Sequence, residues 1–343
     1  MERLIRHTNA YKTQRLYASQ GKLRHAYFLL FPDSGSLREV LKIFATLFFE
    51  RNAKTETDRA RVESLIKKES YADCIFYPEA GKKFSVADAE AVEEECILRP
   101  VEGETKLFVI GDFSEATKEA QNKMLKMLEE PPEEVSFLLG ATSSFSVLPT
   151  VLSRVEKIEI PSFSESEITA YLLRNVPSLS ERDAALCAKS SGGIPGKALE
   201  LASGGYFKEL TQAAWNLCFS TPASLPYLVR EYGATKYPKE LLSLLKIIYF
   251  DALKLKIAKE RNLTFPGSVS DNENVIKLAG QYRKGELLKA LNVLSDIAGQ
   301  YRKGELLKAL NVLSDGERQL YFNGSFAQIL EISLSKILAG NRG

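Results

Sequence analysis

The stretch that decides the fold of this chain runs from residue 106 to residue 160. It reads KLFVIGDF (106–113), SEATKEAQNKMLKMLEEPPEE (114–134) and VSFLLGATSSFSVLPTVLSRVEKIEI (135–160). Two short apolar runs, Leu107–Ile110 and Val135–Leu139, are typical of buried strands. Between them, apolar residues recur at the spacing of one helix face, at Ala116, Ala120, Met124, Met127 and Leu128.

The proline pair of this stretch fixes where the helix ends. Pro131 and Pro132 cannot continue a helix, so we expect it to end at Glu129 or Glu130 and the chain to turn into the next strand. A connection of this length between two buried strands predicts a parallel pair covered by a helix. The sequence therefore predicts an α/β core.

The run NKMLKMLEEPPEEVSFLLGATSSFSVLPTVLSR (122–154) resembles the signature of bacterial clamp-loader subunits, the AAA+ family that contains the gamma/tau and delta-prime subunits of DNA polymerase III. The resemblance covers roughly the first 200 residues. It implies an α/β AAA+ module with a parallel sheet flanked by helices, a helical lid and an all-α C-terminal collar. We expect the AAA+ domain at 1–162, the lid at 163–205 and the collar, which holds the subunits of the ring together, at 206–343.

Composition agrees with a globular chain of more than one domain. The 343 residues are 45% hydrophobic and 26% charged, and no apolar run is long enough to span a membrane. The four scattered cysteines form no CxxC pair, so we expect buried free thiols, neither disulfides nor a metal site, and a cytoplasmic location. The net charge of +2 gives no global attraction to nucleic acid, and we interpret the basic N-terminal segment as a solvated helix face. The zinc module that many members of the family carry is not expected, because Glu50 to Tyr71 contains no cysteine.

The turn after the strand predicted at His25–Leu30 departs from the phosphate-binding pattern GxxxxGK[ST]. In that pattern, backbone amides hold the phosphates, a lysine neutralises charge and a hydroxyl holds magnesium. The four defining positions carry different residues here: Phe31, Ser36, Leu37 and Arg38. The magnesium-binding strand end supplies Asp112, but Phe113 stands where the resembled motor subunits place a catalytic glutamate. We therefore expect no bound ATP or other cofactor and no hydrolysis, which within the family indicates the delta-prime type.

Arg154 is the residue that we expect to carry function. With Ser153 it matches the family's serine-arginine-cysteine motif, although Val155 replaces the cysteine. In the family this arginine reaches the ATP site of a neighbouring subunit, where a guanidinium offsets charge that develops on the γ-phosphate. Spacing alone favours an ordinary solvated arginine before a strand. The surrounding LEEPP and ATSS motifs favour an arginine finger, the arginine that reaches the ATP site of a neighbouring subunit. Thr142, near the sensor position, has no nucleotide to sense and is interpreted as structural.

The C-terminal half is predicted to be helical, with long apolar stripes around Leu210–Cys218, Tyr237–Ala258 and Phe326–Leu338. Ala279–Asp296 recurs without change as Ala298–Asp315. Two identical copies are too few for a repeat array, so a recent duplication or a sequence-assembly error is the better interpretation.

Together these features predict a non-catalytic, delta-prime-like subunit that helps to load the sliding clamp onto primed DNA during replication. Its expected partners are gamma/tau-like ATPase subunits and a delta-like subunit, with the clamp and DNA reached through the hetero-oligomer. Two alternatives stay open: an active ATPase with an atypical phosphate loop, and a delta-type subunit that opens the clamp.

Overall fold

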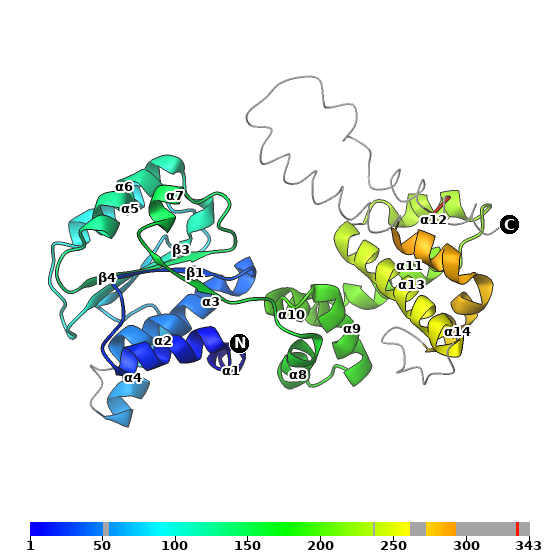
Figure 1. Ribbon diagram of the computed structural model, residues 1–343, viewed down its shortest axis with the longest axis horizontal. Coiled ribbons are helices and arrows are strands. Elements are labelled where there is room, and N and C mark those ends of the chain that lie inside the picture. The colour runs from blue at the N-terminus through cyan, green and yellow to red at the C-terminus, as the bar shows by residue number, and fades with distance from the viewer. Residues whose placement is uncertain (51–54, 236, 261–271, 293–333, 336–343) are drawn as a thin grey trace, which may run out of the picture. The chain divides into compact units, whose positions relative to one another are not determined.

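The computed structural model describes residues 1–50, 55–235, 237–260, 272–292 and 334–335. The chain divides into two compact units (Figure 1). The first comprises residues 1–174 and 192–199, and the second comprises residues 175–191 and 200–343. The division into three domains at 162 and 205 stays a prediction.

The first unit is built on a five-stranded sheet in the order β2-β3-β4-β1-β5, in which every pair of neighbours is parallel. The strands are β1 (Ala26–Leu30), β2 (Cys74–Tyr77), β3 (Lys106–Asp112), β4 (Val135–Ala141) and β5 (Glu156–Glu159). The predicted strand-helix-strand unit is confirmed: β3 and β4 are neighbours, and helix α6 (Lys118–Glu129) between them ends before the proline pair. The sheet flanked by helices confirms the predicted α/β fold class.

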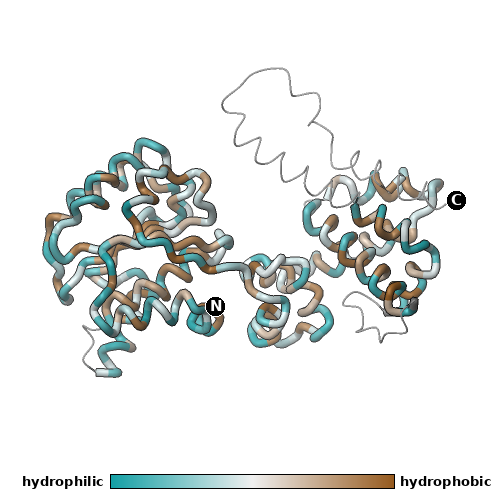
Figure 2. The backbone as a smooth tube through the Cα atoms, in the orientation of Figure 1, coloured by the Kyte–Doolittle hydropathy of each residue, from teal (hydrophilic) through white to brown (hydrophobic). Residues whose placement is uncertain are grey.

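Helices cover both faces of this sheet (Figure 1). One face carries α1 (Glu2–Arg6), α2 (Asn9–Ser19), α3 (Ser34–Ala45), the 3-10 helix η1 (Thr46–Phe49) and α4 (Glu56–Lys67). The other carries α5 (Val86–Glu95), the 3-10 helix η2 (Phe113–Glu115), α6 and the short helix α7 (Pro149–Leu152). Figure 2 shows hydrophobic residues concentrated along the central strands. A strand covered on both sides needs apolar residues at nearly every position, which explains the continuous runs seen in the sequence.

Alternate residues of each strand pack against opposite helix layers. Phe108 and Phe137, on neighbouring strands, stack with ring centroids 5.7 Å apart beneath α5 and α6. On the other face Leu41 of α3 lies so close to Gly140 that a Cβ there would meet its Cδ1 at 2.6 Å. Each fully buried side chain of this size contributes roughly 1.5–3 kcal/mol. The two layers therefore fix α3 and α6, and with them both candidate sites described below.

Side-chain caps begin the helices of this unit where the sequence places Ser and Thr. Thr117 accepts from the Ala120 N–H at the start of α6. Ser85 and Asp88 form a capping box at α5. Ser164 and Glu167 form a second capping box at α8 (Glu165–Asn175), where the Ser164 N–H donates to the glutamate at 2.9 Å. Each such cap stabilises a helix by about 1 kcal/mol.

The described part of the second unit is helical. It contains α9 (Glu181–Ser191), the end of α10 (Pro195–Ser203), α11 (Tyr206–Cys218), α12 (Leu225–Tyr232), α13 (Pro238–Glu260) and α14 (Asn272–Gln281). The apolar stripes predicted at Leu210–Cys218 and Tyr237–Ala258 lie on α11 and α13. The second copy of the duplication, and all but residues 334–335 of the stripe at Phe326–Leu338, lie outside the described residues. None of the described helices combines the length and apolar content that crossing a membrane requires.

Candidate functional site

The turn between β1 and α3 holds the positions of the phosphate-loop pattern. Phe31 is 1% exposed, and its N–H donates to the Ala141 carbonyl at 2.9 Å, so it continues the sheet beyond β1. Leu37, at the position of the pattern's lysine, is 2% exposed and belongs to the core. The side chain of Ser36 is also buried. None of these three side chains carries a positive charge to the first turn of α3.

A residue not selected from the sequence, Asp33, lies at the centre of this turn. It precedes α3, is 5% exposed, and makes no cap to its own helix. Its Oδ2 instead accepts from the Gly196 N–H at 2.6 Å, in the first turn of α10. A Cβ on Gly196 would lie 2.6 and 2.7 Å from the Asp33 carboxylate oxygens and 2.8 Å from Ser36 Oγ. The start of a helix favours an anion, and at the start of α3 that anion is the Asp33 carboxylate. The backbone of Gly196 covers it.

Arg38, at the position of the pattern's hydroxyl residue, points to the ends of β2 and β3. Its Nε and Nη2 donate to the two carboxylate oxygens of Glu69 at 2.7 and 2.6 Å, and its Nη1 donates to the Pro78 carbonyl at 2.9 Å. Hydrogen bonds from Arg38, with the nearby Lys42, lower the pKa of Glu69 from 4.5 to about 2. This bidentate pair holds the guanidinium in place.

Asp112, at the end of β3, is tied to the neighbouring strand. Its carboxylate accepts from the Thr142 hydroxyl at 2.8 Å and the Thr142 N–H at 3.2 Å, and the Ser114 N–H and hydroxyl also donate to it. Phe113 is completely buried and packs on Phe84, with ring centroids 5.8 Å apart. These contacts agree with a structural role for Thr142 and with a strand end that serves packing.

Arg154 lies in the turn between α7 and β5, with its side chain 31% exposed. Its Nε donates to Glu129 Oε1 at 2.6 Å, and Nη2 contacts the same oxygen. Its Nη1 donates to the Thr150 carbonyl at 2.6 Å and to Ser153 Oγ at 3.2 Å. Ser153 in turn donates its hydroxyl to the Thr150 carbonyl at 3.0 Å, so the predicted pair acts as one unit at the end of α7.

The parallel sheet separates these two groups of residues. Asp33 and Arg38 follow the carboxyl end of β1 and Asp112 is the last residue of β3, whereas Arg154 lies two residues before the amino end of β5. Glu129 is the last residue of α6, which returns the chain to the amino end of β4. The neighbouring strands β1 and β5 have five and four residues and span roughly 13–17 Å. Arg154 therefore lies at the opposite edge of the sheet from the chain's own phosphate-loop turn.

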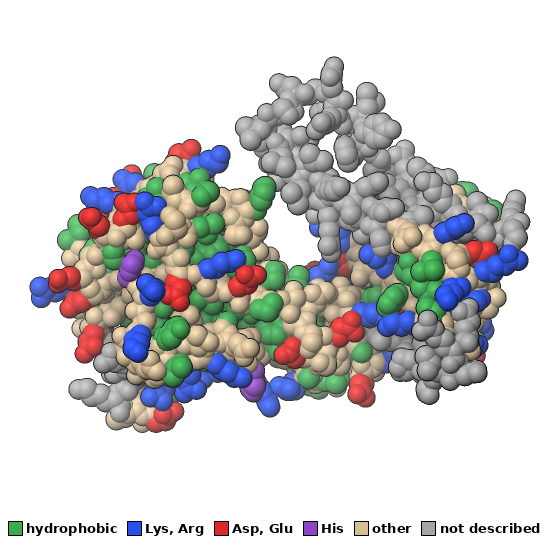
Figure 3. Space-filling model, viewed as in Figure 1, with side chains coloured by type: hydrophobic (Ala, Val, Ile, Leu, Met, Phe, Trp, Pro, Cys, Tyr) green, Lys and Arg blue, Asp and Glu red, His purple; other side chains and the backbone are tan. Residues whose placement is uncertain are grey.

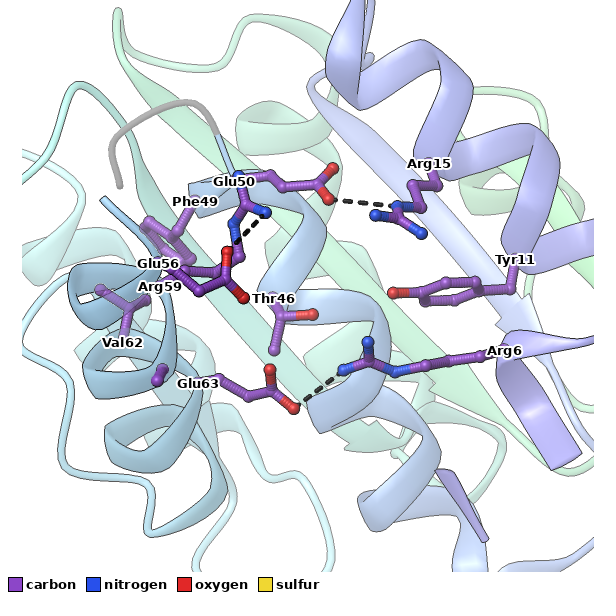
Figure 4. Close-up of a pocket in the computed structure, with 11 residues that line it drawn as sticks. Arg6, Tyr11, Arg15, Thr46, Phe49, Glu50, Glu56, Arg59, Val62 and Glu63 are labelled. Atoms are coloured by element: carbon purple, nitrogen blue, oxygen red, sulfur yellow. Dashed lines mark hydrogen bonds and ion pairs between the residues drawn. The ribbon is translucent and has the colours of Figure 1, made fainter. Parts of the chain in front are cut away.

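Three arginines of the basic N-terminal segment form ion pairs within the fold. Arg6 pairs with Glu63 at 2.8 Å, Arg15 with Glu50 at 3.2 Å, and Arg24 with Glu156 at 2.6 Å. The first two pairs line a cavity of about 180 Å³ between α2 and α4, with Tyr11 and Thr46 between them (Figure 4). On the face seen in Figure 3, the α/β unit presents Lys and Arg side chains interspersed with Asp and Glu. This arrangement supports the interpretation of the segment as a solvated structural face.

The described residues contain no reactive thiol and no metal-binding cluster. All four cysteines are buried and free, as predicted, and burial raises the pKa of Cys96 and of Cys187 to about 12. Within the described ranges, no group of three or more His, Cys, Asp or Glu residues is arranged to hold a metal ion. The stretch Glu50 to Tyr71, where the zinc module was not expected, contains α4.

Sequence reasoning selected residues at both turns but did not identify the residues that contact them. Glu69 pairs with Arg38 and Glu129 with Arg154, while Asp33 accepts from the N–H of Gly196 in α10. The only local signal was at Asp33, an acidic residue inside a loop whose pattern should attract phosphate. Nothing in the sequence around Glu69 or Glu129 indicates that they pair with Arg38 and Arg154.

Comparison with known proteins gives matches to clamp-loader subunits. Residues 6–164 match the family model described as DNA polymerase III, delta subunit. The chain is 30% identical over 201 residues to the DNA polymerase III subunit delta' of Escherichia coli, covering 57% of this chain and 60% of that protein. It is 27% identical over 153 residues to the subunit tau/gamma of Haemophilus influenzae, covering 44% of this chain and 22% of that protein. The chain thus spans less than two thirds of either relative.

Among solved structures, the chain is similar to a DNA polymerase III gamma subunit-related protein of Thermotoga maritima. The identity is 17%, with 96% of this chain and 98% of that chain covered, and the TM-score is 0.38.

Proposed function

Because this chain belongs to the clamp-loader-related AAA+ subunits, we propose that it is a delta-prime-type subunit whose Arg154 acts in the nucleotide site of a neighbouring gamma/tau-type ATPase. In that role the chain is not itself an ATPase. It contributes to DNA replication as one fixed member of a hetero-oligomer that loads a sliding clamp onto primed DNA.

The observation that carries this proposal is the place of Arg154 in the sheet. The residue precedes β5 at the amino edge, whereas the turn before α3 lies at the carboxyl edge. A strand length separates the two, so the guanidinium can serve only a phosphate that another molecule brings to the amino edge. There it would offer a planar, permanently charged fork suited to a γ-phosphate.

The residues of the turn between β1 and α3 support the proposal that this chain does not bind ATP. A nucleotide there would meet the Asp33 carboxylate, and like charges at close range repel. No lysine is available at Leu37, and Arg38 is held by Glu69. ATP binding would therefore require the contact of Asp33 with Gly196 to break and Arg38 to leave Glu69. We accordingly interpret Phe31, Ser36, Leu37 and Arg38 as a degenerate phosphate loop, and Asp112 and Phe113 as a degenerate magnesium site.

The partners follow from the same proposal. The relatives that match are named delta' and tau/gamma subunits of DNA polymerase III, so we assign this chain gamma/tau-like ATPase partners, a delta-like partner and a cytoplasmic location. Residues 163–205 would serve as the lid and 206–343 as the collar. The apolar stripes of α11 and α13 are then shared between the chain's own helical core and ring assembly.

Equilibrium binding of ATP and magnesium to the isolated chain tests the absence of a nucleotide site. The expected result is no saturable binding at concentrations that saturate a gamma/tau-type subunit assayed beside it. Saturable binding would establish the alternative, an ATPase with an atypical loop. The Glu69→Ala variant sharpens the test, because ATP binding that appears only when Arg38 is freed from Glu69 would show the site to be blocked rather than lost.

A delta-type role in opening the clamp is a second candidate, since the matching family model is described as a delta subunit. The two roles differ in what the isolated chain binds. A delta-type subunit should bind the clamp strongly without its partners, whereas the proposed role requires the assembled ring. Copurification of the isolated chain with the cognate clamp therefore distinguishes them.

A further inference from the structure

The contacts of Arg154 in the isolated chain engage nearly all of its donors. A guanidinium has five N–H groups, distributed over Nε, Nη1 and Nη2. Glu129 Oε1 accepts from Nε and contacts Nη2, while the Thr150 carbonyl and Ser153 Oγ accept from Nη1. A phosphate bound bidentately uses two adjacent nitrogens. Every such pair already contains a nitrogen with a partner, so Arg154 must exchange partners before it binds a phosphate.

We propose that Glu129 is a positioning residue. It binds Arg154 while the neighbouring subunit has no nucleotide at this edge, and it releases Arg154 when the γ-phosphate of that subunit is present. The inference rests on the proposed function, since it concerns the same arginine. It adds a second residue and a regulated state to that site. We refer to the contact of Arg154 with Glu129 as the latch.

The local structure explains why Glu129 holds the arginine there. Glu129 is the last residue of α6, and the carbonyl end of a helix carries partial negative charge. Thr150 lies in α7, whose last carbonyls also lack helical partners. Arg154 therefore lies between two helix ends and a carboxylate, all of which favour a cation. The proline pair after Glu130 prevents α6 from extending, so the carboxylate stays at this edge of the sheet.

The exposure of the latch makes it reversible. The side chains of Arg154 and Glu129 are 31% and 48% exposed, and exposed ion pairs contribute little to stability. A single carboxylate is enough to orient the guanidinium but is a weaker competitor than a phosphate that carries more charge. Removing the Glu129 charge should therefore raise the population of free Arg154 by roughly two- to fivefold, the range that an exposed pair supports.

The test compares Glu129→Gln with Glu130→Gln, which removes the same charge one residue away from an exposed position with no recorded contact to Arg154. In the complex reconstituted with cognate gamma/tau-type and delta-type subunits, ATP hydrolysis is measured without clamp or DNA. The latch predicts that Glu129→Gln raises the rate roughly two- to fivefold over Glu130→Gln. In an Arg154→Ala background this gain should disappear.

A second measurement on the isolated full chain tests the latch without relying on hydrolysis. The exchange of the Arg154 Nε–H with water is followed by NMR, with the signal assigned by its loss in Arg154→Lys. Exchange should accelerate in Glu129→Gln and stay unchanged in Glu130→Gln. If Glu129→Gln and Glu130→Gln show equal Nε–H exchange and equal rates of ATP hydrolysis, the latch is refuted. That result would leave the role of Arg154 in hydrolysis intact if Arg154→Ala still slows the reaction. No effect of Arg154→Ala refutes the finger itself and the release step with it, whatever the exchange data show.

Discussion

Replacing Glu69 with Gln should remove one defined part of the acid sensitivity of the first unit's stability. The Glu69 carboxyl is held by Arg38 and Lys42, and its pKa is lowered from 4.5 to about 2, chiefly by the hydrogen bonds from Arg38. A carboxyl whose pKa is lower in the folded state stabilises the fold above its unfolded pKa. That contribution is lost as the pH falls from about 4.5 towards 2.

The magnitude follows from the shift. Each pKa unit corresponds to about 1.4 kcal/mol, which gives about 3 kcal/mol as an upper limit. The Glu69 side chain is 24% exposed, so solvent screening reduces the expected value to about 2 kcal/mol. Glu69→Gln should therefore lower the free energy of unfolding of the first unit by about 2 kcal/mol at neutral pH. The difference from the unsubstituted chain should shrink steadily below pH 4.5 and be small near pH 2, where about half of the Glu69 carboxyls in the folded chain are protonated.

The assay must report on the first unit, because the chain has two units and need not unfold in one step. Trp215, the only tryptophan, lies on α11 in the second unit, so its fluorescence reports on the wrong part. Hydrogen exchange of peptides from β3 and β4 in a urea series measures the relevant stability. Glu104→Gln is the control, since Glu104 is exposed and has no ion pair among the described residues. An equal effect of Glu69→Gln at pH 6 and pH 3, or an equally large effect of the control, would refute the reasoning.

Two further substitutions test the turns at the carboxyl edge. Gly196→Ala should destabilise the start of α10 by about 1–3 kcal/mol, because the new Cβ would lie 2.6 Å from an Asp33 oxygen; Asp33→Ala should relieve part of that cost in a double-mutant cycle read by hydrogen exchange. Additive effects of the two changes would count against the contact. Asp112→Asn should weaken the bonds to Thr142 and lower the stability of the first unit by about 1–3 kcal/mol without changing ATP binding; a change in ATP binding instead of stability would restore a nucleotide role to this carboxylate.

Local patterns were enough to predict the central α/β unit. The apolar runs that became β3 and β4, the helical spacing of α6 and the proline pair after it each constrain the backbone through residues close in sequence. The same holds for the Ser164 cap of α8, whose partner lies three residues away. Where one turn of the chain contains both partners, sequence reasoning predicts the structure well.

The contacts that define the candidate sites could not be predicted in this way. Asp33 meets Gly196 across 163 residues, and Arg154 meets Glu129 across 25. Arg38 was identified as a departure from the phosphate-loop pattern, but its pairing with Glu69 depends on how α3 packs against α4 and the strand ends. Such partners are chosen by tertiary packing, which brings together charges that no local spacing relates. The sequence shows which groups a binding loop lacks, and the structure adds what occupies their place.

The most direct test of the central claim is the rate of clamp- and primed-DNA-stimulated ATP hydrolysis by the reconstituted complex, with Arg154→Ala in this chain. Arg174→Ala, which removes an exposed arginine from α8, is the matched control, and assembly of each complex is verified before the assay. Our account predicts that Arg154→Ala lowers the rate severalfold or more while the complex stays intact and the control keeps its rate. An unchanged rate in an intact complex would contradict it, and would leave Arg154 a structural residue at the end of α7.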